Sequence, residues 1–132
     1  MREFDTDMIQ LIAVFESISK TEVRDCITND SIYFLVNTGK IAIAIGKGGQ
    51  TIRAAENTLK KSIKIFEWAE DNEQFIKNLI PKAQKVTVNG TGAQVTLNAK
   101  DRGAVFGKGG SNIKIIRELL SRNSEIKELK VI

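Results

Sequence analysis

Near the N-terminus, apolar side chains recur every three or four residues, which is the spacing of one face of an α-helix. The apolar positions are Met8, Leu11, Ile12, Phe15 and Ile18. Asp5 and Thr6 precede them, and either side chain can cap the first turn. This pattern predicts a helix over about residues 6–20.

The same helical spacing returns further along the chain. It involves Phe75, Ile76, Leu79 and Ile80. Asp71 or Asn72 stands where the cap of such a helix belongs, and Pro81 cannot continue it. We therefore expect a second helix over about 71–80.

Each of these helices is followed by two strand-like runs. The runs cover 22–28 and 31–37 after the first helix, and 85–89 and 93–98 after the second. Asn29-Asp30 separates the first pair and Gly90-Thr91-Gly92 separates the second, and both are turn sequences. We expect two β-hairpins.

A glycine cluster occurs twice in the chain. Ile45-Gly46-Lys47-Gly48-Gly49 recurs 61 residues later as Phe106-Gly107-Lys108-Gly109-Gly110. The same shift pairs Asn37 with Asn98, Ile52 with Ile113, Arg53 with Lys114, and Leu59 with Leu120. Self-similarity at a fixed offset indicates two copies of one structural unit. We predict domains at 1–68 and 69–132, each so small that the two copies are expected to pack on each other.

The repeat also guides the interpretation of the residues around each cluster. Residues 41–45 alternate large and small side chains, which alone favours a strand, but their counterparts at 102–106 do not alternate. We therefore predict a short helix before each cluster. Apolar spacing predicts a further helix after it, capped by Ser111 in the second copy, and then a closing strand at 62–66 and about 126–131.

The composition excludes most catalytic chemistry. The chain has no His and a single Cys, Cys26, which removes Ser/His/Asp and Cys/His sites and the usual zinc ligand sets. We expect no enzyme activity, no metal and no cofactor, and we expect Cys26 to fill space in a strand. No apolar stretch approaches the ~20 residues that span a bilayer. The chain is therefore expected to be cytoplasmic, with no membrane partner.

The positive charge is concentrated in the second half of the chain. The net charge is +4, yet residues 1–70 carry 9 basic and 10 acidic side chains while residues 71–132 carry 11 and 6. A basic half beside a nearly neutral half favours a polyanionic partner such as RNA or DNA.

The glycine clusters are suited to phosphate. A Gly-x-x-Gly turn between two helices leaves main-chain N–H groups near a helix N-terminus, where an anion is stabilised, and Lys47 or Lys108 adds a full positive charge. Gly48 and Gly109 have no side chain to obstruct a sugar-phosphate backbone. A Walker loop is excluded because glycine, not Ser or Thr, follows the lysine, and a dinucleotide fingerprint fails on its spacing.

Two such clusters, each preceded by Ile or Phe and followed by Ile, resemble the hallmark of the KH domain. The resemblance implies that each loop grips single-stranded nucleic acid, about four nucleotides at a time. The implied backbone contacts are Gly46, Lys47, Gly48, Gly49 and Arg53 in one copy, and Gly107, Lys108, Gly109, Gly110 and Lys114 in the other. The implied apolar groove contains Ile45, Ile52, Phe106 and Ile113, which are also expected to serve the core.

Each copy is expected to run helix, strand, strand, short helix, glycine loop, helix, strand, an order similar to type II KH domains. This predicts an α+β fold with two tandem units, each a three-stranded sheet with three helices packed on one face. The tandem is similar to the short archaeal NusA-like transcription factors, and nothing in it corresponds to the polymerase-binding N-terminal or S1 domains of bacterial NusA.

That likeness implies a non-catalytic protein that binds single-stranded RNA and acts in transcription termination or antitermination, with RNA polymerase or nascent transcript complexes as further partners. The alternative is a scaffold that docks on polymerase or ribosomal proteins, with the glycine loops serving only as turns. Of the other aromatic residues, Trp68 is expected to pack between the units and Tyr33 within its sheet.

Overall fold

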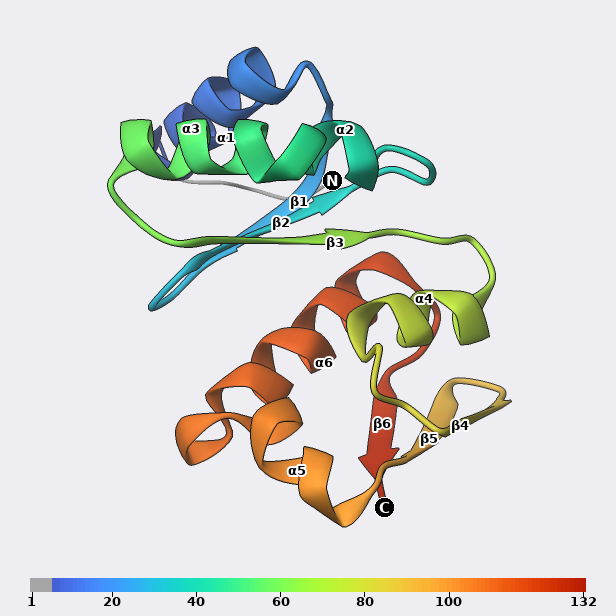
Figure 1. Ribbon diagram of the computed structural model, residues 1–132. Coiled ribbons are helices and arrows are strands. Elements are labelled where there is room, and N and C mark those ends of the chain that lie inside the picture. Colours follow the sequence, from blue (N-terminus) through green and yellow to red (C-terminus); the bar gives the residue numbers. More distant parts are fainter. Residues whose placement is uncertain (1–5) are drawn as a thin grey trace. The chain divides into compact units, whose positions relative to one another are not determined.

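The computed structural model describes residues 6–132, so the proposed cap Asp5 lies outside the described residues. The chain divides into two compact units, Met1–Trp68 and Ala69–Ile132 (Figure 1). Each unit repeats the order of elements expected from the sequence.

The first unit contains a three-stranded mixed sheet with its helices on one face (Figure 1). Its elements are α1 (Thr6–Ser19), β1 (Val23–Thr28), β2 (Ile32–Val36), α2 (Ile41–Ile45), a 3₁₀ turn (Lys47–Gly49), α3 (Gln50–Leu59) and β3 (Ile63–Glu67). The central strand β2 is antiparallel to β1 and parallel to β3. The connection from β2 through α2 and α3 returns the chain to the same sheet, as a parallel pair requires.

The core of the first unit lies between this sheet and its helices. Phe15 of α1 stacks on Phe34 of β2, with ring centroids 4.1 Å apart. Both rings are fully buried, together with Ala44 of α2 and Ala55 of α3. Cys26, which is not in a disulfide, is buried in the same cluster, as a space-filling residue in a strand should be.

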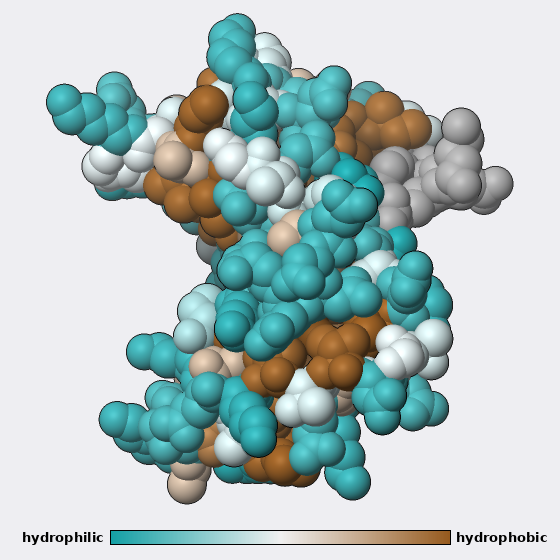
Figure 2. Space-filling view, turned by 90° about the vertical axis from the view of Figure 1, so that its right-hand side faces the viewer, coloured by the Kyte–Doolittle hydropathy of each residue, from teal (hydrophilic) through white to brown (hydrophobic). Residues whose placement is uncertain are grey.

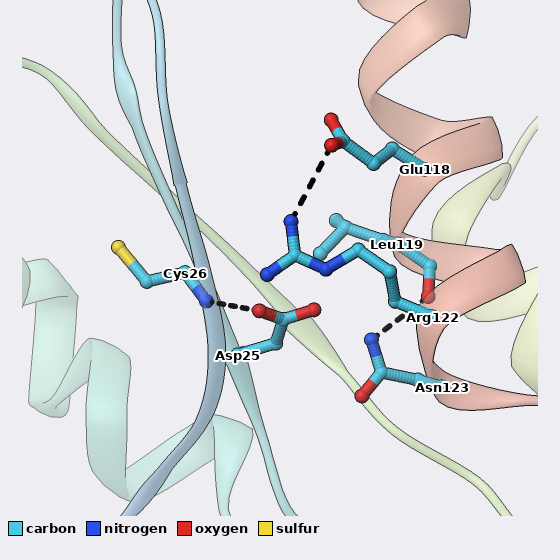
Figure 3. Close-up of polar contacts among 6 residues, drawn as sticks. All are labelled: Asp25, Cys26, Glu118, Leu119, Arg122 and Asn123. Atoms are coloured by element: carbon cyan, nitrogen blue, oxygen red, sulfur yellow. Dashed lines mark hydrogen bonds and ion pairs between the residues drawn. The ribbon is translucent and has the colours of Figure 1, made fainter. Parts of the chain in front are cut away.

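Strand β1 is irregular beside Cys26. Its pairing with β2 shifts register between Val23 and Asp25, and Asp25 is fully buried. The Asp25 carboxylate accepts a hydrogen bond of 2.8 Å from the backbone N–H of Cys26 (Figure 3). The bulge thus places a carboxylate where it can satisfy a backbone donor of its own strand.

The second unit has the same architecture. Its elements are α4 (Asn72–Leu79), β4 (Lys85–Asn89), β5 (Gly92–Thr96), α5 (Ala99–Phe106), a 3₁₀ turn (Lys108–Gly110), α6 (Ser111–Asn123) and β6 (Glu128–Val131). The sheet order is β4-β5-β6, with β5 antiparallel to β4 and parallel to β6. Asp71 caps α4 by accepting a 3.0 Å hydrogen bond from the N–H of Gln74.

Helix α6 ends with side chains that bond back to its last turn. The buried Asn123 donates 2.8 Å to the carbonyl of Leu119, and Arg122 approaches Glu118 at 3.4 Å (Figure 3). Ser124 donates to the carbonyl of Leu120. Asn123 and Ser124 thus bond to backbone carbonyls near the end of the helix, whereas Arg122 and Glu118 form an ion pair between side chains.

The prediction of a short helix before each glycine cluster is confirmed by α2 and α5. The prediction that Ser111 caps α6 is wrong. The N-cap is Gly110, in the left-handed conformation with φ 77°, and Ser111 already has helical angles. The reason is that the 3₁₀ turn leads directly into α6, which leaves no extended residue to act as a side-chain cap.

Few large hydrophobic side chains reach the surface. Among residues 6–132 the exposed ones are Ile9, Ile43, Val88 and Ile132. In Figure 2 hydrophobic residues accordingly form separate patches among hydrophilic ones. No helix in the described part of the chain is long and apolar enough to cross a membrane.

Tyr33 lies in β2 on the sheet face opposite to Phe34, and its ring stacks on Phe66 with centroids 6.4 Å apart. This agrees with its expected role in sheet packing. Burial, and secondarily the negative charge of Asp30, raises the pKa of Tyr33 above 10.0.

Because Tyr33 is the single tyrosine, its ionisation can be followed directly by the absorbance of the phenolate. We expect the titration midpoint of Tyr33 to be higher in the folded protein than in the urea-unfolded chain. The difference between the two midpoints should be smaller in the variant Asp30→Asn. The folded state favours the neutral phenol of Tyr33. The contribution of Tyr33 to the free energy of unfolding is therefore complete below its pKa in the unfolded chain, and is lost as the pH rises through its pKa in the folded protein. A folded midpoint equal to the unfolded one would contradict the assignment.

Trp68 follows β3 and is tied to the first unit. Its backbone N–H donates to the carbonyl of Val36, and its own carbonyl accepts from the hydroxyl of Thr38. The guanidinium of Arg24 lies 3.7 Å from the centre of its ring. This cation–π contact occupies one face of the indole. Packing of Trp68 between the units stays a prediction.

Candidate nucleic-acid interface

The two glycine loops have nearly the same backbone geometry. Gly46 has φ 80° and ψ 164°, and its counterpart Gly107 has φ 73° and ψ 175°. In each loop a hydrogen bond from the N–H of the third glycine to the carbonyl of the first glycine closes the turn. The distance is 3.0 Å from Gly49 to Gly46 and 3.1 Å from Gly110 to Gly107. The repeat found in the sequence is therefore a repeat of loop conformation as well.

The first glycine of each loop is required by the fold. A Cβ added at Gly46 would lie 2.7 Å from the backbone nitrogen of Thr51, and one at Gly107 would lie 2.9 Å from that of Asn112. Both residues also have positive φ. Here the chain bends so sharply that the end of one helix touches the start of the next.

The glycine after the lysine faces open space instead. Gly48 and Gly109 both have φ 62°, and a Cβ at either position would meet no atom within 4 Å. Both residues are exposed. The main chain is therefore accessible at these two positions, and contact with a ligand there stays a prediction.

Lys47 and Lys108 lie at the start of each 3₁₀ turn and are exposed. Within residues 6–132 neither ammonium group has a hydrogen bond or ion pair. Lys47 and Gly48 are the first two residues of the 3₁₀ turn in the first loop, so their backbone N–H groups have no partner inside that turn. Each loop thus combines a mobile positive charge with main-chain donors on one exposed bend, an arrangement suited to phosphate.

The next basic residues of the two copies differ in role. Arg53 donates from Nη1 to the carbonyl of Gly48 at 2.7 Å, so its guanidinium braces the first loop from within. Lys114, at the same place in the second copy, is exposed and has no such bond to any described residue. The second loop therefore lacks this brace, and the charge of Lys114 remains available to a ligand.

The four apolar residues expected in the groove are buried to different degrees. Ile45, Ile52 and Phe106 are half-buried, whereas Ile113 is only 3% exposed. Ile113 therefore belongs to the core of its unit. The exposed Ile43, on α2 immediately before the first loop, is an apolar surface that sequence reasoning did not single out.

Comparison with known proteins agrees with this geometry. Residues 9–70 match a family model described as KH domain. The probable transcription termination protein NusA of Methanocaldococcus jannaschii is 36% identical over 96% of this chain and 73% of its own length. The corresponding Halobacterium salinarum protein is 34% identical over 92% of both chains. The chain belongs to the archaeal NusA family.

The solved structures include a relative of similar extent. The crystal structure of APE1850 has a TM-score of 0.75 and 29% sequence identity, and covers 98% of this chain and 100% of that one. The sequence-based predictions of a NusA-like protein and of an α+β fold with two tandem KH-like units are thus confirmed.

Within this NusA-family fold, the second unit has a cavity of about 740 Å³ near its edge strand β6. It is lined by Thr87, Asn89, Gly92, Ala93, Gln94, Phe106, Arg117, Glu128, Leu129, Lys130 and Val131. Phe106, which the sequence predicts to lie in the apolar groove, is one of these residues, and its contact with a base stays a prediction. The guanidinium of Arg102 lies 5.3 Å from the centre of its ring. Arg117 was not expected, although it stands one helical turn beyond Lys114.

The first unit of this NusA relative has a smaller cavity, of about 560 Å³, beside α3. It is lined by Arg53, Glu56, Asn57, Lys60, Lys61 and Ser62. Glu56 stands 61 residues before Arg117 and is therefore its counterpart. The repeat was recognised from residues that are identical in the two copies. Glu56 and Arg117 could have been found by comparing the positions at which the two copies differ.

Proposed function

We propose that this protein binds single-stranded RNA through its two Gly-Lys-Gly-Gly loops and acts as a NusA-like transcription termination or antitermination factor. Residues 1–68 and 69–132 would each form one KH domain, and RNA polymerase or nascent transcript complexes are the proposed wider partners. The observation that supports this function best is the pair of equivalent loops, each with a lysine that has no described partner beside a glycine that faces open space.

Single-stranded nucleic acid is favoured over a protein partner by the chemistry of these loops. A phosphodiester offers closely spaced anionic oxygens, which main-chain N–H groups and a lysine can bind without side-chain complementarity. The half-buried Ile45, Ile52 and Phe106 offer apolar surface to unstacked bases. Two such sites in one chain also raise the overall affinity when one strand engages both.

Salt dependence tests the proposal. We expect binding of a labelled single-stranded RNA, followed by fluorescence anisotropy, to weaken linearly in log Kd against log salt. Each neutralised phosphate contributes a slope of about 0.7, so the two loop lysines alone contribute about 1.4.

The double variant Lys47→Ala with Lys108→Ala tests the contribution of the two lysines. It should remove about 1.4 from the slope and leave the fold intact. A duplex of the same sequence should bind more weakly, since its bases are stacked and paired. Binding that does not respond to salt, or a slope unchanged in the double variant, would instead favour a scaffold that docks on protein.

A further inference from the structure

Glu56 and Arg117 occupy the same position in the two copies but carry opposite charge. Both contact the edge strand that closes their sheet. Oε2 of Glu56 accepts a 2.8 Å hydrogen bond from the N–H of Ile63. Nε and Nη2 of Arg117 each donate, at 3.2 Å, to the carbonyl of Leu129.

The two edge residues are themselves equivalent. Ile63 pairs with Ile32 of β2, and Leu129 pairs with Ala93 of β5. Ala93 stands 61 residues after Ile32. The same place beside the edge strand is therefore occupied by a carboxylate in the first unit and by a guanidinium in the second.

Both side chains keep hydrogen-bonding capacity after these contacts. Oε1 of Glu56 and Nη1 of Arg117 have no hydrogen bond to any residue of the described chain. Each side chain also lines a cavity, of about 560 Å³ for Glu56 and about 740 Å³ for Arg117. A carboxylate oxygen accepts only, and a guanidinium donates only.

We infer that Glu56 and Arg117 give the two units opposite preferences for the edge of an RNA base. Glu56 accepts from the exocyclic amino groups of adenine and cytosine. Arg117 donates to an exocyclic carbonyl, which uracil, guanine and cytosine have and adenine lacks, as these side chains do when they read base edges elsewhere. This inference rests on the proposed function, since it requires that both units bind RNA.

The surroundings of the two residues agree with this difference. In the second unit Phe106 lines the same cavity as Arg117, and so places an aromatic surface where a base can stack while its carbonyl meets the guanidinium. Ile45, the counterpart of Phe106 in the first unit, is aliphatic and is not among the residues that line the first cavity. Arg53, Lys60 and Lys61 also line the first cavity and suit a phosphate of the same strand. The carboxylate of Glu56 is the group there that matches the amino edge of a base.

The experiment isolates one unit at a time in the full chain. Lys108→Asp with Gly109→Asp disables the second loop, and Lys47→Asp with Gly48→Asp disables the first. Oligoadenylate, oligocytidylate and oligouridylate of equal length are then compared. With the second loop disabled, oligoadenylate and oligocytidylate should be bound about tenfold more tightly than oligouridylate. With the first loop disabled, oligouridylate should be bound more tightly than oligoadenylate, whose base has no exocyclic carbonyl, and oligocytidylate should lie between them because its base has one.

Two substitutions then test the residues themselves. Glu56→Gln keeps an oxygen for the N–H of Ile63 but adds a donor, and Arg117→Gln removes the fork of donors. Each should reduce the preference of its own unit to about twofold or less while changing the affinity for the least favoured oligomer little. Arg117→Lys retains the charge and serves as a second variant if the glutamine variant unfolds.

The outcomes separate this inference from the proposed function. Disabled loops that leave RNA affinity unchanged would overturn the function and the inference together. Disabled loops that lower affinity, combined with base preferences that are absent, reversed or unaffected by Glu56→Gln and Arg117→Gln, would overturn the inference alone. In that case the two side chains serve only to bond the edge strands.

Discussion

Reversing the charge of both glycine loops is expected to lower the affinity for single-stranded RNA by about 10²-fold or more. The variant combines Lys47→Asp and Gly48→Asp with Lys108→Asp and Gly109→Asp. Each loop then presents carboxylates where it offered an ammonium and an open backbone, so that attraction of a phosphate becomes repulsion. Titration of a labelled RNA by anisotropy measures the effect, and each loop changed alone should have a smaller one.

A variant with the same charge change elsewhere shows whether position matters. Lys82→Asp with Gln84→Asp alters charge as much as the change to one loop, at two exposed residues of the same unit as the second loop. It should weaken binding much less than Lys108→Asp with Gly109→Asp. Equal losses would mean that RNA responds only to net charge, and the assignment of the loops would be wrong.

We expect the first glycine of each loop, Gly46 or Gly107, to be essential for stability. The glycine after the lysine, Gly48 or Gly109, should matter far less. Gly46→Ala should lower the free energy of unfolding by about 3 kcal/mol or more, because a backbone conformation reserved for glycine costs roughly 1–3 kcal/mol and the clash with Thr51 adds to it. Gly107→Ala should behave in the same way against Asn112. Urea unfolding followed by circular dichroism measures both.

Gly48→Ala and Gly109→Ala are the matched controls, since these positions share the positive φ but have open space around the added carbon. Their cost should be about 1–2 kcal/mol, that of the left-handed conformation alone. If all four substitutions destabilise the protein equally, the close approach between the helices at Gly46 and Gly107 does not limit stability.

The internal repeat made much of this fold predictable from the sequence. Residues 41–45 alone resemble a strand, because alternation is a local signal that a short buried helix can also show. Their counterpart at 102–106 lacks the alternation, and α2 and α5 are indeed both helices. Comparing two copies therefore resolved an ambiguity that periodicity within one copy could not.

The parts that escaped prediction depend on three-dimensional contacts. Ser111 looked like a cap because Ser is a frequent cap residue, but the left-handed Gly110 begins the helix without one. The bond from the guanidinium of Arg53 to the carbonyl of Gly48 was not predicted, and contact of Arg53 with RNA stays a prediction. Spacing along the chain indicates which helix face a residue occupies, but not whether a carbonyl of the same loop lies within its reach.

The side-chain bonds to Ile63 and Leu129 also bear on how copies of this protein behave at high concentration. Strands β3 and β6 each form one margin of a sheet, and an uncovered margin can add a strand from another molecule and so start aggregation. Glu56 occupies a donor on one margin and Arg117 an acceptor on the other. Each side chain therefore occupies one backbone group that an added strand from another molecule would need, which disfavours strand pairing at that point.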